Sequence, residues 1–73
     1  MDKTIYTKTY ARLISRLKKA RKEAKLKQID VARKLRRTQS YVSKIESGQA
    51  RLDIIQLKEI SQIYKKKLDY FVE

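Results

Sequence analysis

A short stretch in the middle of the chain combines hydrogen-bonding side chains with two apolar residues. The polar members could share the outer face of one helix: Gln39, Ser40, Tyr41, Ser43 and Lys44. Val42 and Ile45 have the three-residue spacing of an inward-facing pair. A glutamine amide can bond to both N6 and N7 of adenine, and a lysine ammonium can reach O6 and N7 of guanine. The chemistry open to this helix is therefore hydrogen bonding to the edges of nucleic-acid bases.

The rest of the chain has to supply elements that hold this helix in place. Proline is absent and Gly48 is the single glycine, so residues that break helices are rare and an all-α fold is expected. Apolar residues spaced by three and four predict helices over 7–24, 28–35 and 54–64, with a last turn or two over 68–72.

Two helix starts have clear local signals. Thr38 is the expected N-cap of a helix that begins at Gln39 and that Gly48 ends. Asp53 and Gln56 have the spacing of a capping box before the helix over 54–64. The prediction is a compact five-helix domain over residues 1–73, in which residues 1–6 form a flexible arm.

Positive charge is concentrated in the first two thirds of the chain. The net charge is +12, and residues 1–51 carry 16 Lys and Arg against 4 Asp and Glu, whereas residues 52–73 carry 4 of each kind. A field of one sign on a small domain attracts polyanions, of which nucleic acid is the commonest. The alternative is a solvated basic surface that only keeps the protein in solution.

Several function classes find no support in the residues. Cysteine and histidine are absent, which excludes thiolate and imidazole metal ligands, disulfides and the usual proton shuttles. No nucleophile with its base, carboxylate pair or glycine-rich phosphate loop can be assembled, so neither an enzyme nor a cofactor is expected. No apolar stretch approaches the ~18 residues of a membrane span, and the start lacks a signal-peptide core, so a cytoplasmic protein is expected. A basic amphipathic helix over 7–24 that lies on a membrane surface is an alternative, although it lacks Trp and Phe anchors.

Residues 28–47 fit the twenty-residue helix-turn-helix pattern. Gln28 stands first, Ala32 fifth, Val42 fifteenth and Ile45 eighteenth. A small residue is needed where two helices cross at a steep angle, and two apolar residues seat the second helix on the first. The segment TQSYVSKIESG at 38–48 closely resembles the recognition helix of the Cro/repressor-type family, and the resemblance extends over about residues 10–72.

The resemblance implies a set of DNA contacts on the second and third helices. The matching positions are Gln28, Gln39, Ser40, Tyr41, Ser43 and Lys44. Thr38 and the loop residue Arg51 are expected to contact phosphates as well. The alternatives are that Gln39, Ser40 and Ser43 are ordinary solvated helix positions, that Thr38 is only a cap, and that Tyr41 is half-buried packing.

The resemblance also implies a structural ion pair and reveals a departure from the family. The family commonly pairs an arginine of the first helix with the glutamate that ends the third, which here are Arg21 and Glu46. Glycine is usual at three helix ends that hold Lys25, Arg36 and Lys65 in this chain. Either these residues adopt the left-handed backbone at a cost on the order of 1 kcal/mol each, or the turns differ.

The expected function is that of a sequence-specific regulator, a repressor or controller-type protein that binds double-stranded DNA as a homodimer on palindromic operators. The dimer surface is expected on the last two helices, where the apolar residues without an assured core role are Ile63, Tyr70, Phe71 and Val72. Phe71 and Val72 could equally close the core of the monomer. The alternative function is a protein-interaction module, such as an antitoxin whose partner is a toxin and whose DNA binding is secondary.

Overall fold

The computed structural model describes residues 8–72, and within this range the chain is all-α. Its helices are α1 (Lys8–Glu23), α2 (Gln28–Leu35), α3 (Gln39–Glu46), α4 (Ile54–Tyr64) and α5 (Leu68–Val72). The predicted five-helix fold is confirmed, and the predicted helix limits agree to within one residue. The arm expected over residues 1–6 lies outside the described residues.

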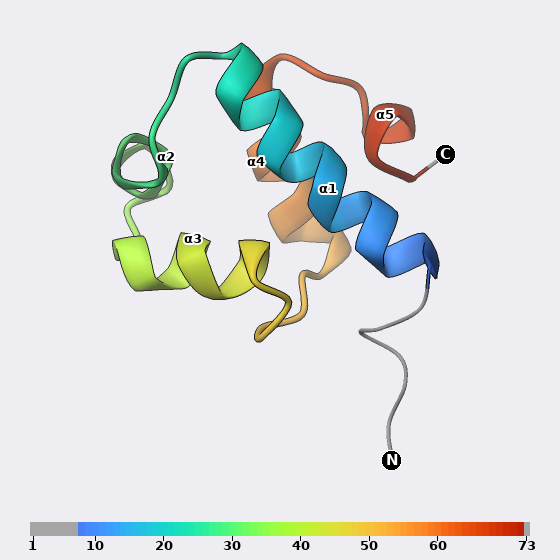
Figure 1. Cartoon of the computed structure of the whole chain (residues 1–73). Coiled ribbons are helices and arrows are strands. Elements are labelled where there is room, and N and C mark those ends of the chain that lie inside the picture. Colours follow the sequence, from blue (N-terminus) through green and yellow to red (C-terminus); the bar gives the residue numbers. More distant parts are fainter. Residues whose placement is uncertain (1–7, 73) are drawn as a thin grey trace.

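The helices pack around one apolar core. Figure 1 shows α1 running across the front, with α3 below it and α4 behind it. Helix α2 packs on α3, α1 contacts both α3 and α5, and α4 contacts α2 and α5. The core includes Leu17, Val31, Ala32, Val42, Ile45, Leu57, Ile60 and Phe71. Val31 and Ala32 are fully buried at the crossing of α2 and α3, which explains why a small side chain is required there.

Helix α5 divides its two apolar terminal residues between the core and the surface. Phe71 is only 1% exposed, whereas Val72 is 53% exposed. Tyr70 is half-buried, and its ring meets the Phe71 ring edge-on with centroids 5.0 Å apart. Of the two residues that could have closed the core, Phe71 does so and Val72 does not. Nothing in the described range has the helix length and hydropathy that crossing a membrane requires.

Side chains cap three of the helix starts. The Thr38 hydroxyl accepts a hydrogen bond from the Tyr41 N–H (3.2 Å), which confirms the predicted N-cap of α3. At α4, the Asp53 carboxylate accepts from the Gln56 N–H (2.7 Å) and the Gln56 amide oxygen accepts from the Asp53 N–H (2.9 Å), the two bonds of a capping box. At α2, Asp30 accepts from the backbone N–H of Lys27.

Three non-glycine residues adopt the left-handed backbone at helix ends. The φ angles of Lys25, Arg36 and Lys65 are 60°, 58° and 57°. After each of them the next N–H bonds back to a helix carbonyl, as in the bonds from Arg37 to Ala32 (2.9 Å) and from Lys66 to Ser61 (2.9 Å). The turns thus keep the geometry that glycine normally provides, at a strain of about 1 kcal/mol or more for each residue.

Replacing Lys65 by glycine should therefore stabilise the protein. Lys65→Gly relieves the left-handed strain and loses part of that gain to backbone entropy, so the free energy of unfolding should rise by about 0.5–1 kcal/mol. Urea unfolding measures the change. Lys67→Gly removes the same charge at a residue whose φ is not positive, and it should not stabilise the protein. Equal changes in the two variants would show that backbone strain is not the cause.

Candidate nucleic-acid interface

The outer face of α3 presents a continuous set of polar side chains. Gln39, Ser40, Ser43 and Lys44 are exposed, and they form two pairs spaced four residues apart, so they lie on neighbouring lines of the same helix surface. On the opposite side, Val42 and Ile45 are 4% and 3% exposed and hold the helix on the core. Four of the five α3 side chains that sequence analysis placed on the outer face are thus brought together on one accessible surface.

Tyr41 differs from these four residues because it faces sideways and packs. Its side chain is half-buried against the core, and the guanidinium of Arg37 lies over its ring at 5.0 Å from the ring centroid. A cation over an aromatic face at this distance is attracted by the electrons of the ring. Tyr41 thereby holds Arg37 beside the first turn of α3. Sequence analysis did not select Arg37, which comes directly before the Thr38 cap.

Arg51, which follows α3 in the chain, is held in a similar way. It lies in the loop between α3 and α4, and its guanidinium is 5.5 Å from the centroid of the Tyr10 ring. The Tyr10 hydroxyl accepts a hydrogen bond from the Leu52 N–H (3.2 Å) and makes a longer contact with the Ala50 carbonyl (3.5 Å). A buried tyrosine of α1 therefore fixes the loop that carries Arg51. Two arginines, each stacked on a tyrosine, thus come before and after α3 in the chain.

A buried ion pair ties α3 to α1. Arg21 donates from Nε to one oxygen of Glu46 (2.8 Å) and from a terminal nitrogen to the other (3.1 Å), which makes the pair bidentate. A third Arg21 donor reaches the Leu26 carbonyl (3.0 Å). Glu46 is 5% exposed. The side-chain amide of Gln28 also donates to Glu46 (3.0 Å), so the carboxylate joins α1, α2 and α3.

The packing around this ion pair shifts the pKa values of Arg21 and Tyr64. The hydrogen bond to Glu46 raises the pKa of Arg21 above its ordinary value. Burial raises the pKa of Tyr64 well above its usual range, and the nearby Glu46 carboxylate adds to this rise. Because folding raises this tyrosine pKa, its ionisation favours unfolding only in alkaline solution, above pH ~10. At neutral pH, Tyr64 is a neutral core residue beside a charged pair.

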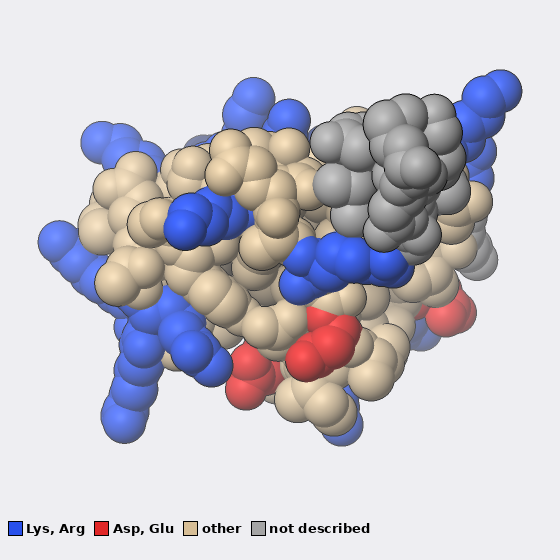
Figure 2. Space-filling view, turned by 90° about the horizontal axis from the view of Figure 1, so that it is seen from below, with Lys and Arg blue, Asp and Glu red and all other residues tan. Residues whose placement is uncertain are grey.

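Figure 2 looks directly onto the side of the molecule on which α3 lies. Basic side chains project around the rim of this face and on the face itself, whereas the acidic groups in view gather along one side. An uncharged area occupies much of the middle. This distribution suits a ligand that carries negative charge along two edges and hydrogen-bonding groups between them, as a DNA groove does.

The sequence matches the family model described as helix-turn-helix over residues 17–71. The matched range begins within α1 and ends within α5, so it includes α2, α3 and the ion pair between Arg21 and Glu46. The chain belongs to the Cro/repressor-type helix-turn-helix family. Comparisons with curated proteins and with solved structures gave no match. The family is one of DNA-binding domains and not a family of enzymes.

As in other helix-turn-helix proteins, the two helices of the motif are adjacent in the chain and packed together, here α2 and α3. Gln28 at the start of α2 is less available than the sequence suggested, because it is half-buried and its amide is engaged by Glu46. The aromatic supports of Arg37 and Arg51 were missed, since nothing local in the sequence indicates which tyrosine an arginine will meet.

Proposed function

We propose that this helix-turn-helix protein is a sequence-specific transcriptional regulator that inserts α3 into the major groove of double-stranded DNA. The observation that carries the proposal is the polar outer face of α3, exposed above the buried Val42 and Ile45. An α-helix fits the width of the major groove, and in this type of motif the second helix occupies it.

The residues of this surface have different roles in the proposal. Gln39, near the start of α3, reads adenine through two hydrogen bonds, and Lys44 reads guanine. Ser40 lies between them and supplies a further hydrogen bond. The residues proposed to contact the DNA backbone are Gln28, Thr38, Tyr41, Ser43 and Arg51. Arg37 joins this second set because its stacking on Tyr41 holds its charge beside α3.

A dimer is part of the proposal, because one recognition helix covers too few base pairs for useful specificity. The exposed large apolar side chains in the described range are Ile54, Ile55 and Val72, at 61%, 63% and 53%. The two isoleucines begin α4, directly after the loop that carries Arg51 (Figure 1). The proposal requires a two-fold contact through them that leaves the two α3 helices on the same side, for half-sites about 34 Å apart on a palindromic operator.

Exposed apolar residues also support a second candidate, an antitoxin or similar module that binds a different protein through the start of α4. Sedimentation of the purified chain, without any other protein, distinguishes the two candidate functions. A self-associating chain supports the dimeric repressor or controller-type regulator, active in the cytoplasm. If the chain stays monomeric at the highest soluble concentration and also on DNA, the result favours the module that binds a different protein.

Selection of bound sites from random duplexes tests the function. The expected result is a palindromic consensus. Gln39→Ala and Lys44→Ala should each weaken the base preference at one position of each half-site. The expected loss is about 1–3 kcal/mol of discrimination against the wrong base. Arg51→Ala should weaken all duplexes alike and lower the dependence of affinity on salt. Binding without any preferred sequence would contradict the proposal.

A further inference from the structure

A shallow groove of about 280 Å³ runs between α1 and α3. It is lined by Lys18, Arg21, Gln28, Ser43, Glu46 and Ser47. Ser43 belongs to the exposed face of α3, so the groove borders directly on the surface proposed to enter the major groove. Lys18 comes from α1, and sequence analysis did not select it.

The charges in this groove do not cancel. The Glu46 carboxylate already accepts hydrogen bonds from Arg21 on both oxygens and from Gln28 on one of them. Its negative charge is therefore matched by Arg21 inside the protein. Within residues 8–72 no carboxylate forms an ion pair with Lys18, and the Ser43 hydroxyl makes no hydrogen bond. A positive charge and a hydrogen-bond donor remain available on the two walls of the groove.

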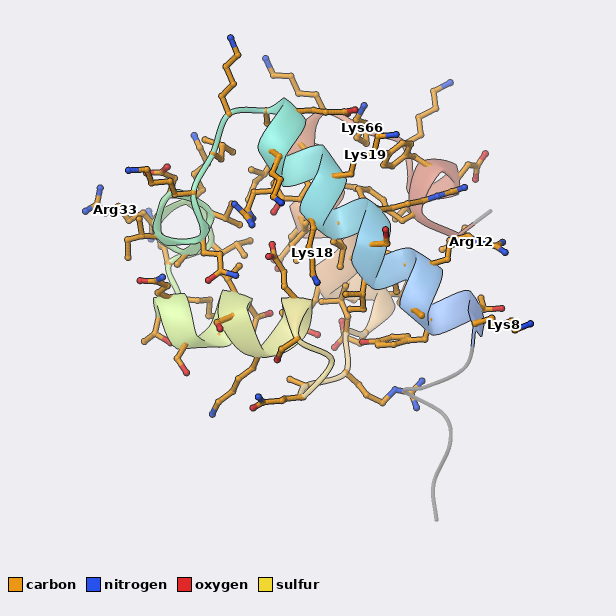
Figure 3. The ribbon with its side chains drawn as sticks, in the orientation of Figure 1. Lys8, Arg12, Lys18, Lys19, Arg33 and Lys66 are labelled. Carbon is orange, nitrogen blue, oxygen red and sulfur yellow. The ribbon has the colours of Figure 1, made fainter. Side chains whose placement is uncertain are left out.

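The direction of Lys18 distinguishes it from its neighbours in α1. Figure 3 shows the Lys18 side chain leading from α1 toward α3, whereas Lys19 lies on the side of Lys66. Both lysines are exposed. Two consecutive residues of a helix point about 100° apart, so only one of them can face α3.

We propose that Lys18 and Ser43 together hold a backbone phosphate of the DNA strand that borders α3 on its α1 side. A helix in the major groove is flanked by phosphates, which lysine ammonium groups and serine hydroxyls commonly contact. The inference rests on the proposed function and extends it by assigning α1 a direct role in DNA binding. The contact reads no base, so it adds affinity for every sequence equally.

The test compares Lys18→Gln with Lys19→Gln, which remove the same charge from adjacent exposed positions. The dissociation constant is measured as a function of salt on the selected operator and on an unrelated duplex. For each bound subunit, Lys18→Gln should weaken binding to both duplexes by about 5- to 10-fold at 0.1 M salt and reduce the slope of log K against log salt by about 0.9, which is about 1.8 for a dimer. Lys19→Gln should leave the slope unchanged. Ser43→Ala should reduce DNA affinity less in the Lys18→Gln variant than in the wild type, because both residues contact one phosphate.

Each other outcome overturns the proposal. Equal slopes for the two lysine variants would show that only net charge matters. If Lys18→Gln lowers affinity for the operator but not for the unrelated duplex, Lys18 takes part in base recognition. A wild-type chain that binds neither duplex would contradict the proposed function itself. A wild type that binds DNA and a Lys18→Gln variant with the same affinity would contradict only this inference. Thermal unfolding of both variants should match the wild type, since both side chains are exposed.

Discussion

Glu46→Gln is expected to lower the free energy of unfolding by about 3 kcal/mol, near the lower end of the range for breaking a buried ion pair. Glu46 is 5% exposed and accepts two hydrogen bonds from Arg21 and one from Gln28. The glutamine keeps the size of the side chain but leaves the Arg21 charge without its partner. The 14% exposure of the Arg21 side chain lets water offset part of this cost, which is why the lower end applies.

Thermal and urea unfolding measure this effect. For a domain of this size the melting temperature should fall by on the order of 10–20 °C. Glu59→Gln is the matched control, because Glu59 is exposed on α4 and forms no ion pair with any residue in the described range. Arg21→Gln combined with Glu46→Gln should destabilise less than the sum of the single changes. A Glu46→Gln melting temperature equal to that of the wild type would refute a structural role for the pair.

Ile55→Glu is expected to reduce affinity for a palindromic operator by about 100-fold or more, with little effect on a single half-site. If two subunits bind through the start of α4, each holds the other near its half-site, and such linkage contributes factors of about 10²–10⁴. The substitution places two buried carboxylates in that contact. The fold should persist, because Ile55 is 63% exposed and a negative charge is favourable in the first turn of a helix.

Gel-shift titrations of full and half operators, with sedimentation of the unbound chain, measure this prediction. Val72→Glu is the control, since Val72 is the exposed apolar residue on α5 and represents the alternative dimer surface. If Val72→Glu abolishes dimers and Ile55→Glu does not, the dimer interface lies on α5. Unchanged operator affinity in both variants would mean that neither surface joins two subunits on DNA.

Local signals accounted for most of the fold. The Thr38 cap and the pair of Asp53 and Gln56 predicted where α3 and α4 begin, because a cap is formed by residues two or three positions apart in the chain. Helical spacing likewise predicted that Val42 and Ile45 face inward. The left-handed conformation of Lys25, Arg36 and Lys65 was one of two open possibilities, since sequence alone does not show how much strain the packed helices can impose.

The sequence by itself determined the helical class, the limits of the helices and four of the five polar side chains assigned to the outer face of α3, whereas Tyr41 packs at its side. The tertiary structure alone decided that Gln28 is engaged by Glu46, that Phe71 is buried while Val72 is exposed, and that Lys18 faces α3 while Lys19 does not. The physical reason is the range of the interactions. Helical period and capping act over a few neighbouring residues, whereas burial and partner choice depend on segments that meet only after the chain has folded.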